Sequence, residues 1–239
     1  MPSGFPTPPC RLDVTNKKEV AGTVRLALER FGGIDVLVNN AGYGYRAAVE
    51  EADDEDIKAL LATNFFGPVF MIKAVLPGMR AQRKGTIINV SSIAGRFAAP
   101  GSGFYSASKF ALEGMSSALL KEVGPLGIRV MVVEPGAFRT DFAGRSLHQS
   151  SVAIADYADT AGRRRKENDQ THGTQPGDPV RAARAIVEVV NRDKVPFRLL
   201  LGSDAVRLVS AEMDIQRQEL EDWKDISLAT DFDAAQREL

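Results

Sequence analysis

The sequence predicts an α/β fold in which helices cover both faces of a doubly wound parallel sheet. Short β-branched strands alternate with one-sided helical segments from about residue 12 to residue 215. Small or polar residues follow several of these strands directly. Because right-handed crossovers bring the carboxyl ends of parallel strands to one edge, these residues are expected to meet there in a ligand crevice.

Composition limits both the size class and the partners of the protein. At 239 residues and 44% hydrophobic, the chain suffices for one domain with a sizeable core. The 30 basic and 31 acidic residues nearly balance, which gives no electrostatic footprint for nucleic acid or an anionic membrane. The single cysteine, Cys10, suits a reducing compartment. No signal peptide or apolar run of ~20 residues is evident, so we expect a cytoplasmic protein without a membrane partner.

The chain divides into a leader and one domain. Residues 2–9 hold four prolines and a glycine, which resist both helix and central strand, so residues 1–10 are predicted to be a disordered leader. Residues 11–239 are predicted to form a single domain, because no linker or internal repeat interrupts them. Within it, residues 137–178 show no sustained periodicity, and a region of this length beside a crevice is typical of a substrate-covering segment.

The regular elements follow from periodicity and caps. Residues 11–14 suit the end of a strand, and Thr15 is expected to cap a helix that Gly32-Gly33 ends. Strands are predicted at 34–38, 85–90, 127–133 and 197–201, and helices beginning near 53, 103, 178 and 203. The basic run at 163–166 adjoins acidic residues and is interpreted as a solvated helix face or loop.

One helix carries the pair that most strongly suggests chemistry. Tyr105 and Lys109 are four residues apart and share a helix face, so the ammonium is expected to favour the phenolate. A free phenol titrates near ~10, too high for efficient proton transfer at neutral pH unless a cation lowers its pKa. Ser92 follows the strand before this helix, and a loop can return its hydroxyl to the helix start. An ordinary solvated helix face is the alternative for the pair.

Other candidates lie at strand ends or inside an apolar helix. Asn39 to Gly42 follow one strand, where small residues allow a ligand to approach the backbone, although a plain turn fits too. Pro135-Gly136 closes another strand. Asn64 stands in an apolar helix, where its amide needs partners or costs ~1–3 kcal/mol, and a satisfied core amide is the alternative.

Taken as a set, these residues resemble the short-chain dehydrogenase/reductase family in order and approximate spacing. The resemblance covers roughly residues 11–215 and implies a Rossmann-type fold. It also implies roles for the catalytic set: Tyr105 as acid/base, Lys109 as the group that lowers its pKa and holds the nicotinamide ribose, Ser92 as the residue that polarises the substrate carbonyl, and Asn64 as the holder of a water that links Lys109 to solvent.

The same resemblance implies a cofactor site for NAD or NADP. Asp13 with Val14 would contact the adenine, Asn40, Ala41 and Gly42 the adenosine side, and Thr140, after Pro135-Gly136, the carboxamide end of the nicotinamide. Tyr105 and Lys109 would contact the cofactor as well. No metal ligand is implied.

The sequence departs from the family at its beginning. Nothing before Arg11 matches the family's first strand and glycine-rich pyrophosphate loop, so we expect a fold that is N-terminally truncated relative to the family. The strand at 34–38 would then be an exposed apolar edge, which is an aggregation hazard. The residues that choose between NAD and NADP are also missing, and weak dinucleotide binding is expected.

The sequence favours hydride transfer between a nicotinamide and an alcohol or ketone. Phe97, Phe104 and Phe138 near the expected pocket suit an apolar substrate, although core positions fit them equally. A cofactor-deficient family remnant that acts as an assembly or binding module is the main alternative, and a sugar-nucleotide epimerase fits worse. We also expect a homodimer or homotetramer through the helix that carries Tyr105, whose other face offers four apolar residues. They are Phe110, Leu112, Met115 and Leu119.

Overall fold

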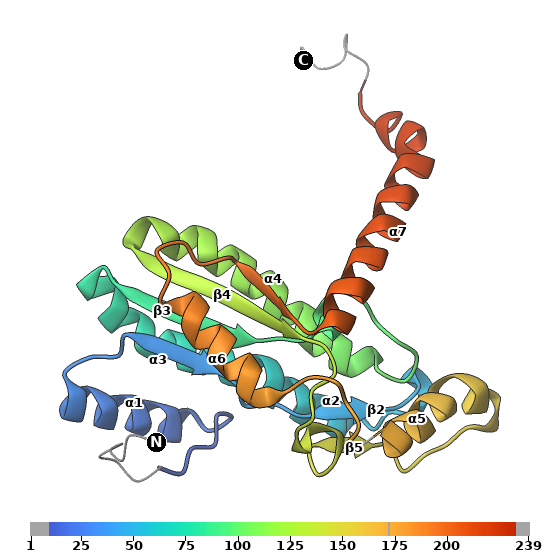
Figure 1. Cartoon of the computed structure of the whole chain (residues 1–239), viewed down its shortest axis with the longest axis horizontal. Helices are drawn as coiled ribbons and strands as arrows, with labels where there is room; N and C mark the ends of the chain where they lie inside the picture. The colour runs from blue at the N-terminus through green and yellow to red at the C-terminus, as the bar shows by residue number, and fades with distance from the viewer. Residues whose placement is uncertain (1–9, 172, 233–239) are drawn as a thin grey trace.

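A computed structural model of the chain describes residues 10–171 and 173–232 (Figure 1). The leader predicted at residues 1–10 lies outside this range except for its last residue, Cys10, which is exposed.

The central sheet has four parallel strands in the order β1-β3-β4-β6. They span Val36–Asn39 (β1), Gly85–Val90 (β3), Ile128–Pro135 (β4) and Arg198–Leu201 (β6). A second, two-stranded parallel sheet joins β2 (Gly44–Arg46) to β5 (Leu147–Gln149). The four strands of the central sheet lie where the sequence predicts strands, whereas β2 and β5 were not predicted.

Helices connect the strands, and polar side chains cap the first turn of several of them. The α-helices are α1 (Lys17–Phe31), α2 (Asp54–Leu61), α3 (Gly67–Gln82), α4 (Gly103–Val123), α5 (Arg163–Thr171), α6 (Pro179–Val190) and α7 (Ser203–Leu228). Single-turn helices are η1 (Val49–Glu51), η2 (Ala62–Phe66), η3 (Ile93–Gly95), η4 (Gly124–Leu126), η5 (Asp141–Ala143), η6 (Ala155–Tyr157) and η7 (Ala158–Gly162). The N-caps Asn16, Asp53 and Asp178 accept bonds from the first helical N–H groups, so Asn16 takes the position expected of Thr15.

Helices pack on both faces of the central sheet, as the sequence predicts. On one face, residues of α3 and α4 such as Val75, Met79 and Leu119 form a core with Ile87 and Val130. On the other face, α6 contributes partly buried residues that pack on β3 and β4. They are Ile186, Val189 and Val190, against Ile88, Met131 and Val133. The doubly wound α/β prediction is confirmed.

The same packing corrects part of the expected subunit interface. Leu112 and Leu119 are only 1% and 6% exposed, because they face the monomer's own core rather than solvent. Met115 is partly buried against that core as well. Phe110 remains, with 46% of its surface exposed.

The strand β1 forms an edge of the described sheet. Its Val36 and Val38 side chains are 43% and 51% exposed, as expected of an apolar edge strand. The segment at 11–14 is not a strand: Asp13 instead accepts bonds from the Thr15 amide and hydroxyl and closes a turn before α1. Local side-chain bonding by Asp competes with strand pairing here.

The run Asp54–Gln82 is a continuous helical stretch of 29 residues that would be long and apolar enough to cross a membrane by length and composition. In the fold, however, its Leu60, Ile72 and Met79 are buried in the monomer core. This arrangement is typical of a core helix.

Candidate active site

The helix α4 places Tyr105 and Lys109 on its buried face. Their side chains are only 5% and 6% exposed. The Lys109 Nζ lies 5.8 Å from the centroid of the Tyr105 ring and donates a hydrogen bond of 2.9 Å to the carbonyl of Val90, the last residue of β3. One turn of helix thus puts an ammonium and a phenol at the carboxyl end of a central strand.

Ser92 joins this pair from the loop after β3. Its Oγ accepts a 3.1 Å hydrogen bond from the Ala94 amide and so caps η3, which fixes the position of the hydroxyl. The same side chain lies close enough to Tyr105 to act on its phenol, whose pKa it lowers. The structure therefore brings Ser92 and Tyr105 together although 12 residues of chain separate them.

Asn64 links the turn after β1 to α4. It lies in η2, a π-helical turn between α2 and α3, and is fully buried. Its side chain accepts from the Tyr43 amide at 3.0 Å and donates to the Tyr43 carbonyl at 2.9 Å and to Ser108 Oγ at 3.1 Å. A Cβ on Gly42 would lie 3.1 Å from Asn64 Oδ1 and 3.6 Å from Lys109 Nζ, so a larger residue would crowd this cluster.

Burial controls the protonation of both groups on α4. Burial raises the pKa of Tyr105 above 10.0, while Ser92 and the charge of Arg46 act in the opposite direction. Burial likewise lowers the pKa of Lys109 to about 8, against the opposing influence of Glu113. The net lowering of the Tyr105 pKa that the sequence predicts is therefore not found, because the loss of water outweighs the opposing effects of Ser92 and Arg46.

The cofactor-side residues are spread over several elements. Asn40 and Ala41 follow β1 and are exposed, while Gly42 belongs to the Asn64 cluster. Pro135 ends β4, which pairs with β3 in the sheet, and Gly136 follows it.

The remaining cofactor-side residues make mainly local contacts. Asp13 is exposed, and Val14 packs on Gly67 at the start of α3. Thr140 is exposed, and its hydroxyl accepts from the Phe142 amide at 3.2 Å. The sequence argument for these three residues was their resemblance to the family, and their cofactor contacts stay predictions.

A segment of irregular structure lies over Tyr105. We call residues 137–171 the cover. Its strand β5 pairs with β2, and its Phe142 ring lies 5.6 Å from the Tyr105 ring, centroid to centroid. A Cβ on Gly101 would contact Ala161 of the cover at 3.2 Å. The cover adds Phe142 to the residues that bury Tyr105, and its opening for substrate stays a prediction.

One carboxylate holds much of the cover in place. Glu51 is 3% exposed, and its side chain accepts from the Ile154 amide at 2.9 Å and from the Ala48 amide at 2.7 Å. It also pairs with Arg165 of α5. The expectation that the basic run 163–166 is a solvated face is therefore wrong at Arg165, whose side chain is 13% exposed. A distant acidic partner was not visible in the local charge pattern.

Sequence reasoning missed two groups at the site. Phe142 lies in the aperiodic segment, where no pattern singles it out. Arg46 belongs to β2 and is 7% exposed, with its guanidinium carbon 5.8 Å from the Tyr105 ring centroid. The sequence signal for Arg46 was its position: it follows two tyrosines in the short run after Gly42 and precedes two alanines.

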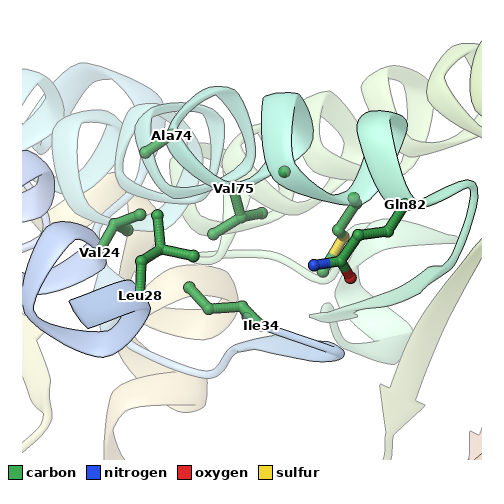
Figure 2. Close-up of a pocket in the computed structure, with 8 residues that line it drawn as sticks. Val24, Leu28, Ile34, Ala74, Val75 and Gln82 are labelled. Carbon is green, nitrogen blue, oxygen red and sulfur yellow. The ribbon is translucent and has the colours of Figure 1, made fainter. Parts of the chain in front are cut away.

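Two hollows of the described surface lie elsewhere. A small one, about 20 Å³, lies between α1 and α3, where Val24, Leu28, Ile34 and Val75 point toward one another (Figure 2). Another is lined by residues at the amino ends of the strands, including Val36, Gly85 and Arg129. Because the ligand crevice of such a fold lies at the carboxyl ends, we interpret the hollow in Figure 2 as a packing gap.

Comparisons with known proteins show the family to which the chain belongs. The sequence model of the family described as short chain dehydrogenase matches residues 4–151. The chain belongs to the short-chain dehydrogenase family. It is 39% identical to Oxidoreductase BOA17 of Botryotinia fuckeliana (strain B05.10), over 93% of this chain and 81% of that protein. It is 44% identical to a 3-ketodihydrosphingosine reductase of Bacteroides thetaiotaomicron, over 80% of this chain and 71% of that protein.

Two solved structures have a similar fold. A short-chain dehydrogenase from Streptomyces avermitilis superposes with a TM-score of 0.86 at 40% identity, covering 92% of this chain and 80% of its own. ElxO with NADP bound gives a TM-score of 0.66 at 26% identity, covering 83% of this chain and 77% of its own. The family relationship identifies this chain as an oxidoreductase of the short-chain dehydrogenase type.

The nicotinamide end of such a cofactor fits the residues present. Lys109 is buried with one hydrogen bond recorded for its three N–H donors, so it has donors to offer to hydroxyl groups. A side chain at position 42 would crowd Asn64 and Lys109. Gly42 therefore presents only backbone on that side of Lys109. Among the described residues, no group of three or more His, Cys, Asp or Glu is arranged to hold a metal ion.

Proposed function

We propose that this protein transfers a hydride between NADP or NAD and an alcohol or ketone, with Tyr105 as the acid/base. The observation that carries the proposal is the convergence of Tyr105, Lys109 and Ser92 at the carboxyl end of β3, with Asn64 behind Lys109. The NADP-bound relative supports NADP as the first cofactor to test. The reductase from Bacteroides supports the ketone direction.

Each side chain has a distinct task in this proposal. Tyr105 donates its proton to the carbonyl oxygen during reduction and takes a proton from the alcohol during oxidation. Ser92 donates a hydrogen bond to the same oxygen and stabilises the charge that develops on it. A bound nicotinamide supplies or accepts the hydride, and the protein supplies orientation and the proton.

Lys109 and Asn64 support these steps from behind. When protonated, Lys109 stabilises a phenolate by charge and offers N–H donors to ribose hydroxyls. Asn64 fixes the backbone of Tyr43 beside Gly42 and so holds the wall that faces Lys109. A water held by Asn64 would connect Lys109 to solvent, as the family resemblance implies.

The direct test measures reduced-nicotinamide consumption with a panel of small and apolar ketones. Replacing Tyr105→Phe removes the proton donor and is expected to lower kcat by about 10²–10⁴. Ser92→Ala is expected to lower kcat by about 10²–10³. Ser91→Ala is the matched control, because Ser91 adjoins Ser92 but its buried Oγ makes no hydrogen bond in the described part of the chain.

Calorimetric titration with NADPH and NADH separates the enzyme from a cofactor-deficient remnant. Micromolar binding together with loss of turnover in Tyr105→Phe supports the enzyme. Binding absent at millimolar nucleotide favours the remnant as an assembly or binding module, and full activity in Tyr105→Phe contradicts the assigned chemistry.

The cellular setting is also part of the proposal. We propose a cytoplasmic enzyme with a small-molecule substrate and no nucleic-acid or membrane partner, on the ground of its balanced charge. We also propose a homodimer or homotetramer through α4. Phe110 is the residue of α4 that supports it, since Leu112 and Leu119 are buried. Phe66, the last residue of η2 before α3, is 47% exposed and extends the apolar surface that this interface requires.

A further inference from the structure

Arg46 is a buried cation at the site whose charge lacks a matching carboxylate among the described side chains. It is 7% exposed, and its Nε makes no hydrogen bond within the described part of the chain. Its Nη1 donates to the Tyr45 carbonyl at 3.2 Å. Burial lowers the pKa of Arg46 to about 10, and the like charge of Arg164 acts in the same direction. A guanidinium in this setting is costly unless an anion compensates it.

Two other poorly exposed arginines in the described part of the chain do have such an anion. Arg96 pairs with Glu134 at 3.2 Å, and Arg165 pairs with Glu51. Arg46 instead faces the Tyr105 ring, with 5.8 Å between its guanidinium carbon and the ring centroid. The Arg46 guanidinium thus offers an unused N–H donor beside the acid/base tyrosine. This arrangement is typical of a ligand-binding group, whereas a structural arginine would be paired with a carboxylate.

We propose that Arg46 binds a carboxylate or phosphate group of the substrate, so that the preferred substrate is an anionic alcohol or ketone. This inference rests on the proposed function, because it assigns the substrate class of the same site. The planar fork of an arginine suits both anions. Since Arg46 adjoins Tyr105, the anionic group and the reacting oxygen belong to one small molecule.

Matched substrates test this specificity. Acetoacetate and its methyl ester share the ketone and differ in charge, and glycerone phosphate with glycerone gives a phosphate pair. We expect kcat/KM to favour the anionic member in the wild type and Arg46→Met to lose that preference by about 10–100-fold, with the neutral member still reduced. Arg163→Met, whose side chain is exposed on α5, is the charge-matched control and is expected to keep the preference.

Thermal unfolding gives an answer that does not depend on turnover. At constant ionic strength, the anionic compounds are expected to raise the Tm of the wild type by about 2 °C or more, but not that of Arg46→Met. An unchanged preference and an unchanged Tm response in Arg46→Met overturn the inference. A wild type that binds the anion but reduces neither ketone contradicts the proposed function and leaves the anion site standing.

The helix α7 carries a second, independent feature. It projects away from the body of the protein (Figure 1), and every described residue from Met213 onward is exposed. Large apolar side chains nevertheless recur along one stripe. Val206, Met213 and Leu220 follow at intervals of seven residues, and Trp223 continues the stripe, with exposed fractions of 52%, 51%, 62% and 62%. With Gln216 as its one polar member, this spacing is that of a coiled-coil seam.

The charges beside the stripe distinguish between orientations of a partner helix. Glu212 and Glu219 flank it on one side, and Arg217 and Lys224 on the other. In a parallel pair of identical helices, Glu212 would face Arg217 of the second copy, and Glu219 would face Lys224. In an antiparallel pair, acidic side chains would face acidic ones and basic would face basic.

We infer that α7 pairs with α7 of a second copy as a parallel two-helix coiled coil. The charge pattern selects this occupant, since it is self-complementary only in the parallel orientation. The seam is short, so the association is expected to be weak and concentration-dependent.

Sedimentation equilibrium of the full chain tests this pairing. Leu220→Glu places a charge in the seam and is expected to weaken the dimer at least about 10-fold. Ile215→Glu is the control, because Ile215 is 56% exposed on the opposite face of α7 and its replacement is expected to leave the dimer unchanged. In a Cys10→Ser background, Ser227→Cys is expected to form a disulfide-linked dimer on oxidation, since only parallel helices bring this position near its own copy.

Three outcomes overturn the pairing. One is a monomer at all concentrations, and another is an assembly whose size Leu220→Glu leaves unchanged. The third is a dimer that Phe110→Glu abolishes while Leu220→Glu does not, which would place the interface on α4.

Discussion

Tyr105 lies between two regions that are built in different ways. The frame, which we define as β3, β4, α4 and η2, holds Tyr105 and Lys109 by regular hydrogen bonding and a dense core. The cover reaches the same tyrosine from the other side through short elements and a few polar contacts, chiefly those of Glu51. The frame therefore holds Tyr105 and Lys109 in place, whereas a single substitution can make the cover open more easily.

The difference has a physical cause. Each frame residue is restrained by several neighbours in regular elements, so its position does not depend on one contact. The cover includes exposed backbone and single-turn helices, and segments of this kind open at a lower free energy than core strands. Substitutions in the two regions should separate these behaviours.

The largest stability effect is expected from Asn64→Leu in the frame. Leucine is similar in size to asparagine but cannot form its hydrogen bonds. The Tyr43 amide, the Tyr43 carbonyl and the Ser108 hydroxyl would each lose their bond to the buried Asn64 side chain. We expect a loss of about 3 kcal/mol in the free energy of unfolding, measured by urea denaturation. Asn191→Ala, at the exposed end of α6, is expected to cost less than about 1 kcal/mol. A cost below about 0.5 kcal/mol in Asn64→Leu would show that Tyr43 is held by other contacts.

Lys109 gives the frame a pH-dependent stability. Its pKa is about 8 in the folded protein and 10.5 as an unperturbed group, so the unfolded chain binds more protons between these values. The stability contributed through Lys109 therefore rises with pH above about 8, by about 2 kcal/mol between pH 7 and pH 9.5. Lys109→Met should lack this rise, whereas Lys121→Met, exposed on the same helix, should retain it. Parallel pH profiles of the wild type and Lys109→Met would refute the assignment.

The contrast between frame and cover also explains which parts of the structure could be predicted from the sequence. Strand and helix periodicity located β3, β4 and α4, and through them Ser92, Tyr105 and Lys109. The aperiodic segment gave no register, so Phe142 and the pairing of β5 with β2 were not predicted. Burial is a property of the assembled structure, which is why helix spacing alone gave the wrong direction for the Tyr105 pKa. The ion pair of Arg165 with Glu51 joins distant residues and was hidden for the same reason.

Release of the cover is the next largest effect. Glu51→Gln keeps the shape of the side chain but leaves the Arg165 charge, which is 13% exposed, without its carboxylate. We expect the cover to open more easily by about 1.4 kcal/mol, which corresponds to roughly 10-fold faster hydrogen exchange at the Ile154 amide. The urea midpoint of the frame should change little.

Glu50→Gln is the matched control for this release. Glu50 is the neighbouring, exposed carboxylate, which accepts from the Tyr157 hydroxyl at 2.7 Å, and an amide oxygen still accepts that bond. Equal exchange rates in Glu50→Gln and Glu51→Gln would mean that the charge of Glu51 does not hold the cover.

The smallest effect on stability, and the most specific one on chemistry, is expected from Phe142→Ala. Phe142 is half-buried, so its truncation should cost only about 1 kcal/mol of global stability. It lies on the Tyr105 ring, however, and burial is the largest cause of the raised pKa of that phenol. Admitting water should therefore lower the Tyr105 pKa toward 10.0. Ultraviolet titration, with Tyr105→Phe subtracted to isolate the phenol, measures this shift, and Phe31→Ala, at a side chain that is 60% exposed, is the control. If the pKa of Tyr105 stays as high in Phe142→Ala as in the wild type, the frame and not the cover excludes water from the acid/base group.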